Sequence, residues 1–243
     1  MSTANSRPRR ARAALAALAL AALSAAGCSS DDRQTASCGV VMDITGFRGY
    51  QVSKSIVDRN LPGFLDGCGW VAYAAITGNS EGSPCQEAPI PLYADTKNEL
   101  TDRRVHQKLL QEAAARAERL RTCAQDDAKG SDVLGGLRVM ADRLAAAPDS
   151  GGERRIAVFS DLMSNTGGLD LSACDVGGEP ARTSIVTGLK DKELIADLGG
   201  SAIDVYGFNL LSERRPECVP PLESLWKSIF ATAGVGASNL TIH

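Results

Sequence analysis

Three pairs of polar residues, each a carboxylate with a hydroxyl group, follow an apolar run or precede an amphipathic one: Asp43 with Thr45, Ser131 with Asp132, and Ser160 with Asp161. Carboxylate and hydroxyl oxygens are hard ligands that suit Mg2+, Mn2+ or Ca2+ better than zinc. The same groups also satisfy backbone amides, because Ser131 or Asp132 can cap a following helix and Asp43 can accept from those amides. The pattern therefore predicts either a divalent-metal site or capping of a helix near strand ends.

Other catalytic arrangements do not occur in the sequence. The two histidines, His106 and His243, fall on the flank of an expected helix and at the C-terminus, so neither is placed as the base for a nucleophile. Ser160 lacks the Gly-x-Ser-x-Gly elbow, and the turn after Asp43 lacks the spacing of a phosphate-binding loop. We therefore expect a protein that is not an enzyme. A metal-dependent hydrolase is the alternative, because paired carboxylates can act with a metal ion.

Strands and helices that alternate along the chain must position these residues. Apolar runs predict strands at 38–45, 69–77, 89–94, 154–163, 201–210 and 239–243. Amphipathic patterns predict helices at about 48–65, 101–125, 131–147 and 191–198, and a last helix from Pro220. Crossover helices allow neighbouring strands to run in parallel. We therefore expect an α/β fold, a doubly wound, mostly parallel sheet with helices on both faces, which binds ligands beyond the carboxyl ends of its strands.

Three segments of this pattern resemble the motifs of von Willebrand factor A domains. VVMDITGF is similar to the first strand and the metal-adhesion motif of that family, GSDVLGGL to its turn into a helix, and IAVFSDLM to its strand that ends in Ser-Asp-Gly. The resemblance covers residues 38–243, with the three motifs in the family's order. It implies a binding or assembly module that uses the crevice above its sheet to present a metal ion to a carboxylate of a protein partner.

The resemblance also implies a set of metal ligands, which consists of Asp43, Thr45, Ser131 and Asp161. Phe47 stands at the position of the family's second serine and cannot bind a metal, so one ligand is missing. Leu162 stands where glycine is usual, which would crowd the rim of the crevice. We therefore expect weak binding of Mg2+ or Mn2+, or none. Arg48 offers an alternative, since a guanidinium can neutralise Asp43 and Asp161 without an ion.

The N-terminus is typical of an exported lipoprotein. Four arginines precede an apolar stretch of signal-peptide length, which is shorter than the roughly 20 residues of a transmembrane helix. The sequence LSAAGC resembles a lipobox, in which Cys28 would receive a diacylglycerol, although Ala25 replaces the preferred leucine. We predict a signal peptide over 1–27, a lipidated tether over 28–37 and a domain over 38–243, anchored on the outer face of the bacterial cytoplasmic membrane. Secretion with Cys28 as a free thiol is the alternative.

The other cysteines are spread singly along the chain, without a Cys-x-x-Cys pair: Cys38, Cys68, Cys85, Cys123, Cys174 and Cys218. In an exported protein this pattern favours disulfides over a zinc site, with buried free thiols as the alternative. One pair is expected at the amino ends of neighbouring strands, a second after two late strands, and the third by elimination. These pairs are Cys38–Cys68, Cys174–Cys218 and Cys85–Cys123.

The charge of the chain argues against nucleic acid as a partner. The chain has 26 basic and 29 acidic residues, and loss of residues 1–27 with their four arginines changes the formal net charge from −3 to −7. We therefore expect a protein partner, and contact with the membrane through the lipid. A solute-binding lipoprotein of a transport system is a further alternative, although roughly 205 residues leave little room for two lobes.

Overall fold

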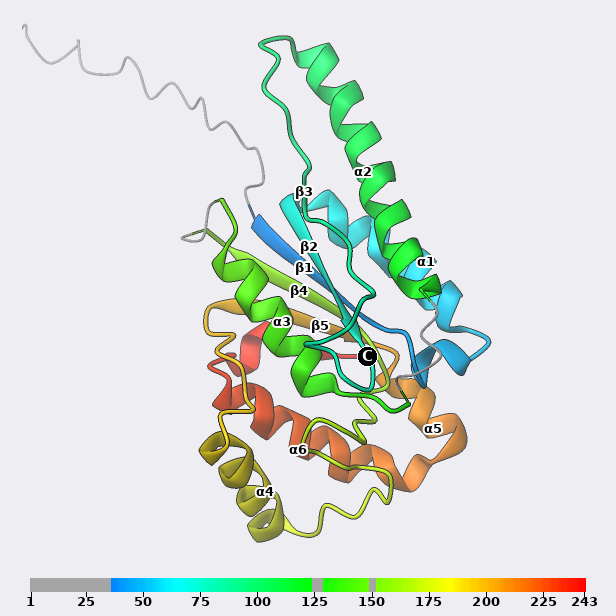
Figure 1. Cartoon of the computed structure of the whole chain (residues 1–243), viewed down its shortest axis with the longest axis vertical. Coiled ribbons are helices and arrows are strands. Elements are labelled where there is room, and N and C mark those ends of the chain that lie inside the picture. The colour runs from blue at the N-terminus through cyan, green and yellow to red at the C-terminus, as the bar shows by residue number, and fades with distance from the viewer. Residues whose placement is uncertain (1–35, 124–128, 149–151) are drawn as a thin grey trace, which may run out of the picture. The chain divides into compact units, whose positions relative to one another are not determined.

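The central sheet has six strands in a computed structural model that describes residues 36–123, 129–148 and 152–243 (Figure 1). The strands are β1 (Ala36–Asp43), β2 (Cys68–Ile76), β3 (Ile90–Pro91), β4 (Arg154–Phe159), β5 (Ser201–Tyr206) and β6 (Leu240–Ile242). Their order across the sheet is β3-β2-β1-β4-β5-β6. All neighbouring pairs are parallel except β2 with β3. The fold belongs to the doubly wound α/β class that the sequence predicts.

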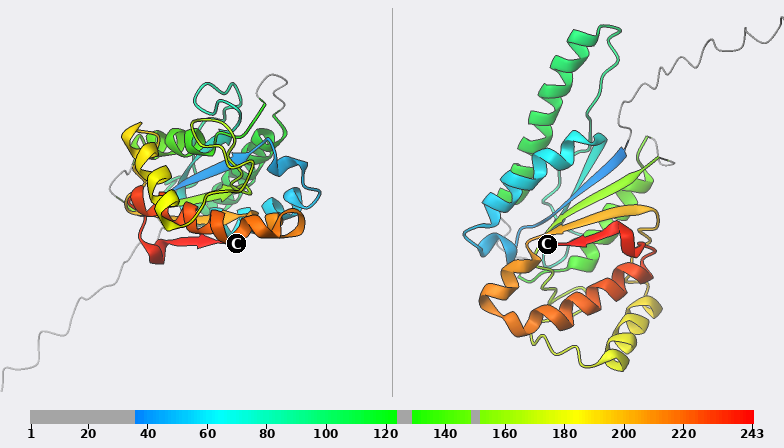
Figure 2. Two further views of the ribbon diagram at one scale, coloured as in Figure 1. Left: turned by 90° about the horizontal axis from the view of Figure 1, so that it is seen from below. Right: turned by 180° about the vertical axis from the view of Figure 1, so that it is seen from behind.

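Helices cover both faces of this sheet. The α-helices are α1 (Ser53–Asp66), α2 (Glu99–Thr122), α3 (Val133–Ala145), α4 (Glu179–Asp191), α5 (Leu211–Arg214) and α6 (Val219–Thr232). The 3-10 helices are η1 (Phe47–Gly49), η2 (Phe208–Leu210), η3 (Pro216–Cys218) and η4 (Ala237–Asn239). Side chains of α1 and α2 belong to one apolar core, and side chains of α3, α4 and α6 belong to the other. Figure 2 shows how these helices surround the sheet.

The central strand β1 is buried on both faces, as an apolar run in a parallel sheet should be. Val41 packs in the core beneath α3, whereas Val40 and Met42 pack in the core beneath α1 and α2. Gly39 lets α3 lie close, because a Cβ atom there would stand 2.3 Å from the sulfur atom of Met140. This tight packing fixes the strand that ends at Asp43.

Several expected boundaries are wrong, and the strands expected at 154–163 and 201–210 end at Phe159 and Tyr206. The short helix at 191–198 is not present, and α4 ends where it should begin. Pro180 lies in the first turn of α4, where its fixed φ suits a helix start. The helix expected from residue 48 begins at Ser53, after η1. The last two residues of the expected tether, Ala36 and Ser37, are buried in β1.

The three disulfides are confirmed, with the predicted pairs Cys38–Cys68, Cys85–Cys123 and Cys174–Cys218. The free-thiol alternative is therefore wrong. The predicted signal peptide, the tether up to residue 35 and the lipidated Cys28 lie outside the described residues. Among the helices that the structure describes, none is long and apolar enough to cross a membrane.

The order of the strands creates one point where the winding reverses. The chain passes from β1 to β2 on one side of β1, and later returns to β4 on its other side. Open α/β sheets bind ligands at such a point, beyond the carboxyl ends of the strands. Met42 of β1 pairs with Phe159 of β4, so the next residues, Asp43 and Ser160, come side by side. The sheet therefore delivers two of the predicted polar residues to the same place.

Candidate functional site

Asp43 is the centre of a hydrogen-bonded cluster at this reversal point, and it is fully buried. Its Oδ1 atom accepts from the amide of Thr45 at 2.9 Å and from the hydroxyl of Thr45 at 2.7 Å. Its Oδ2 atom accepts from the hydroxyls of Ser131 at 3.2 Å and Ser160 at 2.8 Å. The structure thus joins β1, the turn before α3 and the end of β4 through one carboxylate.

Asp161 lies next to this cluster but has its own partners. Its carboxylate accepts from the amide of Met163 at 3.0 Å. A hydrogen bond from Tyr50 also lowers the pKa of Asp161, and the guanidinium of Arg214 lies 4.2 Å from the centre of the Tyr50 ring. Asp161 is 4% exposed. The fourth predicted ligand is therefore near Asp43 but is covered by Tyr50.

Burial controls the charge of both carboxyl groups. Burial and the negative charge of Asp161 together raise the pKa of Asp43 to about 6, against the lowering effect of the hydrogen bonds from Thr45 and Ser160. Burial also raises the pKa of Asp161, against the lowering effect of the Met163 amide. The two acids thus share a site that disfavours two negative charges.

The two departures from the family pattern point away from the crevice. Phe47 is fully buried in the core beneath α1 and α2, and a Cβ atom on Gly207 would lie 2.3 Å from its ring. Leu162 has a φ of 59°, in the left-handed region, yet its side chain is fully buried and its carbonyl accepts from the indole of Trp226 at 3.0 Å. The expected crowding of the rim by Leu162 is therefore wrong. Burial of a leucine contributes about 1.5–3 kcal/mol, enough to offset a backbone strain of about 1–3 kcal/mol.

Asp132 caps a helix, which is the alternative to metal binding that the sequence predicts for the pair Ser131 and Asp132. Its Oδ1 atom accepts from the amide of Gly135 at 2.8 Å, at the first turn of α3. Ser131 instead donates its hydroxyl to Asp43. The two neighbouring residues thus have different roles, since Asp132 caps α3 and Ser131 belongs to the Asp43 cluster.

An open pocket of about 520 Å3 lies beside the cluster. Its wall includes Thr45, Gly46, Arg48, Lys129, Ser131 and Asn165. Neither Asp43 nor Asp161 lines it, and no other described carboxylate does. Asn165 is fixed by the amide of Ser131, which donates to its Oδ1 atom at 2.6 Å. The surface that faces a ligand therefore combines hydroxyl, amide and two cationic side chains with the apolar Ile44 and Met163.

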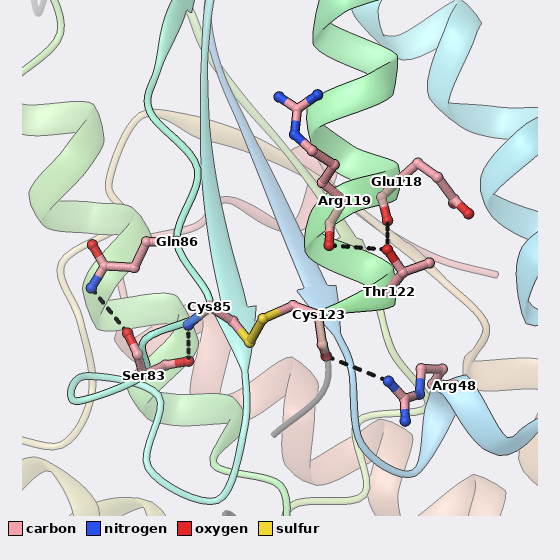
Figure 3. Close-up of a disulfide and its surroundings, with 8 residues drawn as sticks. All are labelled: Arg48, Ser83, Cys85, Gln86, Glu118, Arg119, Thr122 and Cys123. Atoms are coloured by element: carbon pink, nitrogen blue, oxygen red, sulfur yellow. Dashed lines mark hydrogen bonds between the residues drawn. A yellow bond between two sulfur atoms is a disulfide. The ribbon is translucent and has the colours of Figure 1, made fainter. Parts of the chain in front are cut away.

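Arg48 does not neutralise Asp43 and Asp161, so the expected alternative in which its guanidinium takes the place of a metal ion is wrong. Its guanidinium donates from Nη1 to the carbonyl oxygen of Cys123 at 3.4 Å, and Cys123 is bonded to Cys85 (Figure 3). In the part of the chain that the structure describes, Arg48 pairs with neither Asp43 nor Asp161. The guanidinium of Arg214 stacks on the ring of Tyr50, and its positive charge lowers the pKa of Asp161.

This arrangement fits a divalent ion poorly. Both oxygens of Asp43 already accept hydrogen bonds, and neither Asp43 nor Asp161 lines the pocket; Thr45 and Ser131 direct their hydroxyl protons to Asp43, which leaves only the lone pairs of their oxygens as ligands. Arg48 and Lys129 add positive charge to the wall of the pocket. Within the described ranges, no group of three or more His, Cys, Asp or Glu residues could hold a metal. A divalent ion in the pocket would therefore meet two hydroxyl oxygens but no described carboxylate, and would lie beside two cationic side chains.

Sequence reasoning did not identify three residues of this site: Tyr50, Lys129 and Asn165. Lys129 precedes the Gly130–Ser131 turn directly, and this closeness in sequence is a signal that would have found it. Tyr50 and Asn165 stand in irregular segments, without a periodic pattern. Their roles depend on contacts with Asp161 and Ser131.

The chain matches no protein-family model and no curated protein sequence. Solved structures that are similar include proximal thread matrix protein 1 (PTMP1) from the mussel byssus, in two crystal forms. Each aligns with a TM-score of 0.34 and 10% identity over 70% of this chain. The alignments cover 37% and 36% of the mussel chains, so this chain spans little more than a third of their length. A likeness at this level supports no conclusion about function.

Proposed function

We propose that this protein is an exported, membrane-anchored binding module of the von Willebrand factor A type, which holds a protein partner at the carboxyl edge of its sheet. The main support is the cluster at the reversal point, where Asp43 joins Thr45, Ser131 and Ser160 beside an open polar pocket. These residues come from the three segments that resemble the family, in the family's order. The pocket lies where sheets of this class bind ligands.

The proposed location is the outer face of the bacterial cytoplasmic membrane. The signal-like N-terminus and the lipobox-like sequence before Cys28 support it. Three disulfides are typical of an oxidising compartment outside the cytoplasm. The lipid at Cys28 would hold the domain at the membrane while the pocket binds its partner.

A divalent ion has at most a minor part in this proposal. Weak binding of Mg2+ or Mn2+ at Asp43, Thr45 and Ser131, or no binding, is expected because Phe47 supplies no ligand. A hydrolase would need a carboxylate at the substrate, and neither Asp43 nor Asp161 lines the pocket. A two-lobed solute-binding protein would need two sheets, whereas the described residues form one.

Site-blocking variants test where the partner binds. Gly46 lines the pocket, and a Cβ atom there meets nothing within 4 Å, so Gly46→Tyr adds a large ring at the rim without a clash. Gly63 on α1 is an exposed glycine with equally open surroundings, which makes Gly63→Tyr the matched control. Cells that produce the tagged full chain are treated with a cross-linker, and the products are identified by mass spectrometry.

We expect wild type and Gly63→Tyr to cross-link to the same protein, and Gly46→Tyr to lose that product. A partner that Gly46→Tyr retains at the wild-type level would place the interface elsewhere and overturn the proposal. The same conclusion would follow if wild type formed no cross-link to any protein at its natural level of expression.

A further inference from the structure

The wall of the pocket is positively charged. Arg48 and Lys129 line it, and no described carboxylate does. Neither side chain forms an ion pair with a carboxylate of the described residues. Two such cations beside one open pocket would attract a negatively charged ligand.

Arg48 is held in place while most of its donors remain available. One guanidinium nitrogen donates to the carbonyl oxygen of Cys123, which the disulfide to Cys85 ties to the loop after β2 (Figure 3). A guanidinium has several N–H groups in a planar fork that matches the two oxygens of a carboxylate. The side chain is therefore oriented at the pocket and can still bind an anion.

Asn165 adds a neutral donor of known orientation. The backbone amide of Ser131 can only donate, so the Asn165 atom that faces it at 2.6 Å is the oxygen. The Nδ2 group of Asn165 is then left to donate to a ligand. Thr45 and Ser131 direct their hydroxyl protons to Asp43, so these two hydroxyl groups line the pocket without donating to an anion, and the donors that remain are those of Arg48, Lys129 and Asn165.

We propose that this pocket binds an acidic side chain of the protein partner by direct contact with Arg48, Lys129 and Asn165, without a metal ion. The inference rests on the proposed function, because it names the chemistry of the partner at the same edge of the sheet. The formal charge of the chain without residues 1–27 is −7, so this pocket is a local positive site on an acidic protein. An acidic segment of a partner would be guided to it and repelled elsewhere.

Fluorescence anisotropy tests this inference on the detergent-solubilised full chain, in buffer with EDTA. The probe is a fluorescein-labelled glycine–serine peptide with a central run of glutamates, and its glutamine counterpart is the control peptide. We expect the glutamate peptide to bind and the glutamine peptide not to bind. Arg48→Gln and Lys129→Gln should each weaken binding about tenfold, which corresponds to the loss of one hydrogen bond to a charged group.

Arg104→Gln is the matched control, because Arg104 is an exposed cation on α2 away from the pocket. It should leave the affinity unchanged, and Arg48→Lys should restore part of what Arg48→Gln loses. Equal binding in Arg48→Gln, Lys129→Gln and wild type would overturn the inference. A requirement for added Mg2+ would also overturn it, as would displacement of the peptide by inorganic phosphate at concentrations where free glutamate has no effect.

The cross-linking experiment separates failure of this inference from failure of the proposed function. If Gly46→Tyr loses the partner and the two glutamine variants keep it, the interface is correct and the acidic contact is wrong. If the glutamine variants lose peptide binding but Gly46→Tyr keeps the partner, the pocket binds carboxylates and the proposed function is wrong.

Discussion

Asp43 should make the folded protein less stable as the pH rises from 4 to 7. Burial and the charge of Asp161 raise its pKa in the folded state from 3.8 to about 6. Between these two values the folded state binds a proton that the unfolded state has released. The stability that this proton contributes is therefore complete below pH 3.8 and is lost as the pH rises through 6.

The size of this effect follows from the two pKa values. Each pKa unit between the folded and unfolded states corresponds to about 1.4 kcal/mol. The difference between 3.8 and about 6 then gives about 3 kcal/mol of lost stability. Because Asp43 is fully buried, solvent screening does not reduce this value.

Urea unfolding of residues 29–243, followed by circular dichroism at several pH values, measures this effect. Asp43→Asn keeps the shape of the side chain and cannot titrate, so its stability should change less between pH 4 and 7 than that of wild type, by up to about 3 kcal/mol. Asp161→Asn should move the wild-type transition to lower pH, because it removes the charge that raises the pKa of Asp43. Equal pH dependence in wild type and Asp43→Asn would refute this reasoning.

Three further predictions concern the core, the disulfides and the anchor. Phe47→Ser should lower the free energy of unfolding by about 3–5 kcal/mol, because Phe47 is buried against Gly207. A serine there would face the core, so the Mg2+ affinity in titration calorimetry should stay unchanged, and a gain in that affinity would contradict this. Replacement of both Cys174 and Cys218 by serine should cost roughly 4 kcal/mol in urea unfolding, since the bond closes a loop of 44 residues in sequence; unchanged stability would count against it. Cys28→Ser should move the protein from the membrane fraction to the soluble fraction after cell fractionation, because the acyl chains supply the anchoring; a wild-type protein that is wholly soluble would refute the anchor.

Local sequence patterns were sufficient to predict the strands that carry the site. The buried run before Asp43 and the run before Ser160 each have the length and apolar content of a parallel strand. Once these strands are placed in a doubly wound sheet, their carboxyl ends must lie at one edge. Two disulfide pairs followed from the same topology, because Cys38 and Cys68 stand at the amino ends of neighbouring strands and Cys174 and Cys218 follow late strands; Cys85–Cys123 followed by elimination.

The ends of helices and strands, and the partners of polar side chains, were harder to predict from the sequence. The helix expected at 191–198 is absent and α4 (Glu179–Asp191) precedes that segment, because the first turn of α4, which contains Pro180, lies in a stretch with the polar pattern of a loop. Arg48 stands five residues after Asp43 in sequence, yet its guanidinium contacts Cys123. Proximity in sequence does not fix where a long side chain points, since packing around it decides which partner is in reach.

The sequence by itself determined the fold class and the residues at the strand ends, because the hydrophobic period predicts strands and helices. With the topology expected for this class, it also predicted the pairing of the cysteines. The tertiary structure decided which of those residues face a ligand. It buried Phe47 in one core and Leu162 in the other, and it placed Tyr50 in hydrogen-bonding contact with Asp161. It also brought Lys129 and Asn165 to one pocket. The orientation of these side chains depends on contacts between segments that lie far apart in the chain. It is fixed only in the assembled sheet, where apolar surface is buried and buried polar atoms find hydrogen-bond partners.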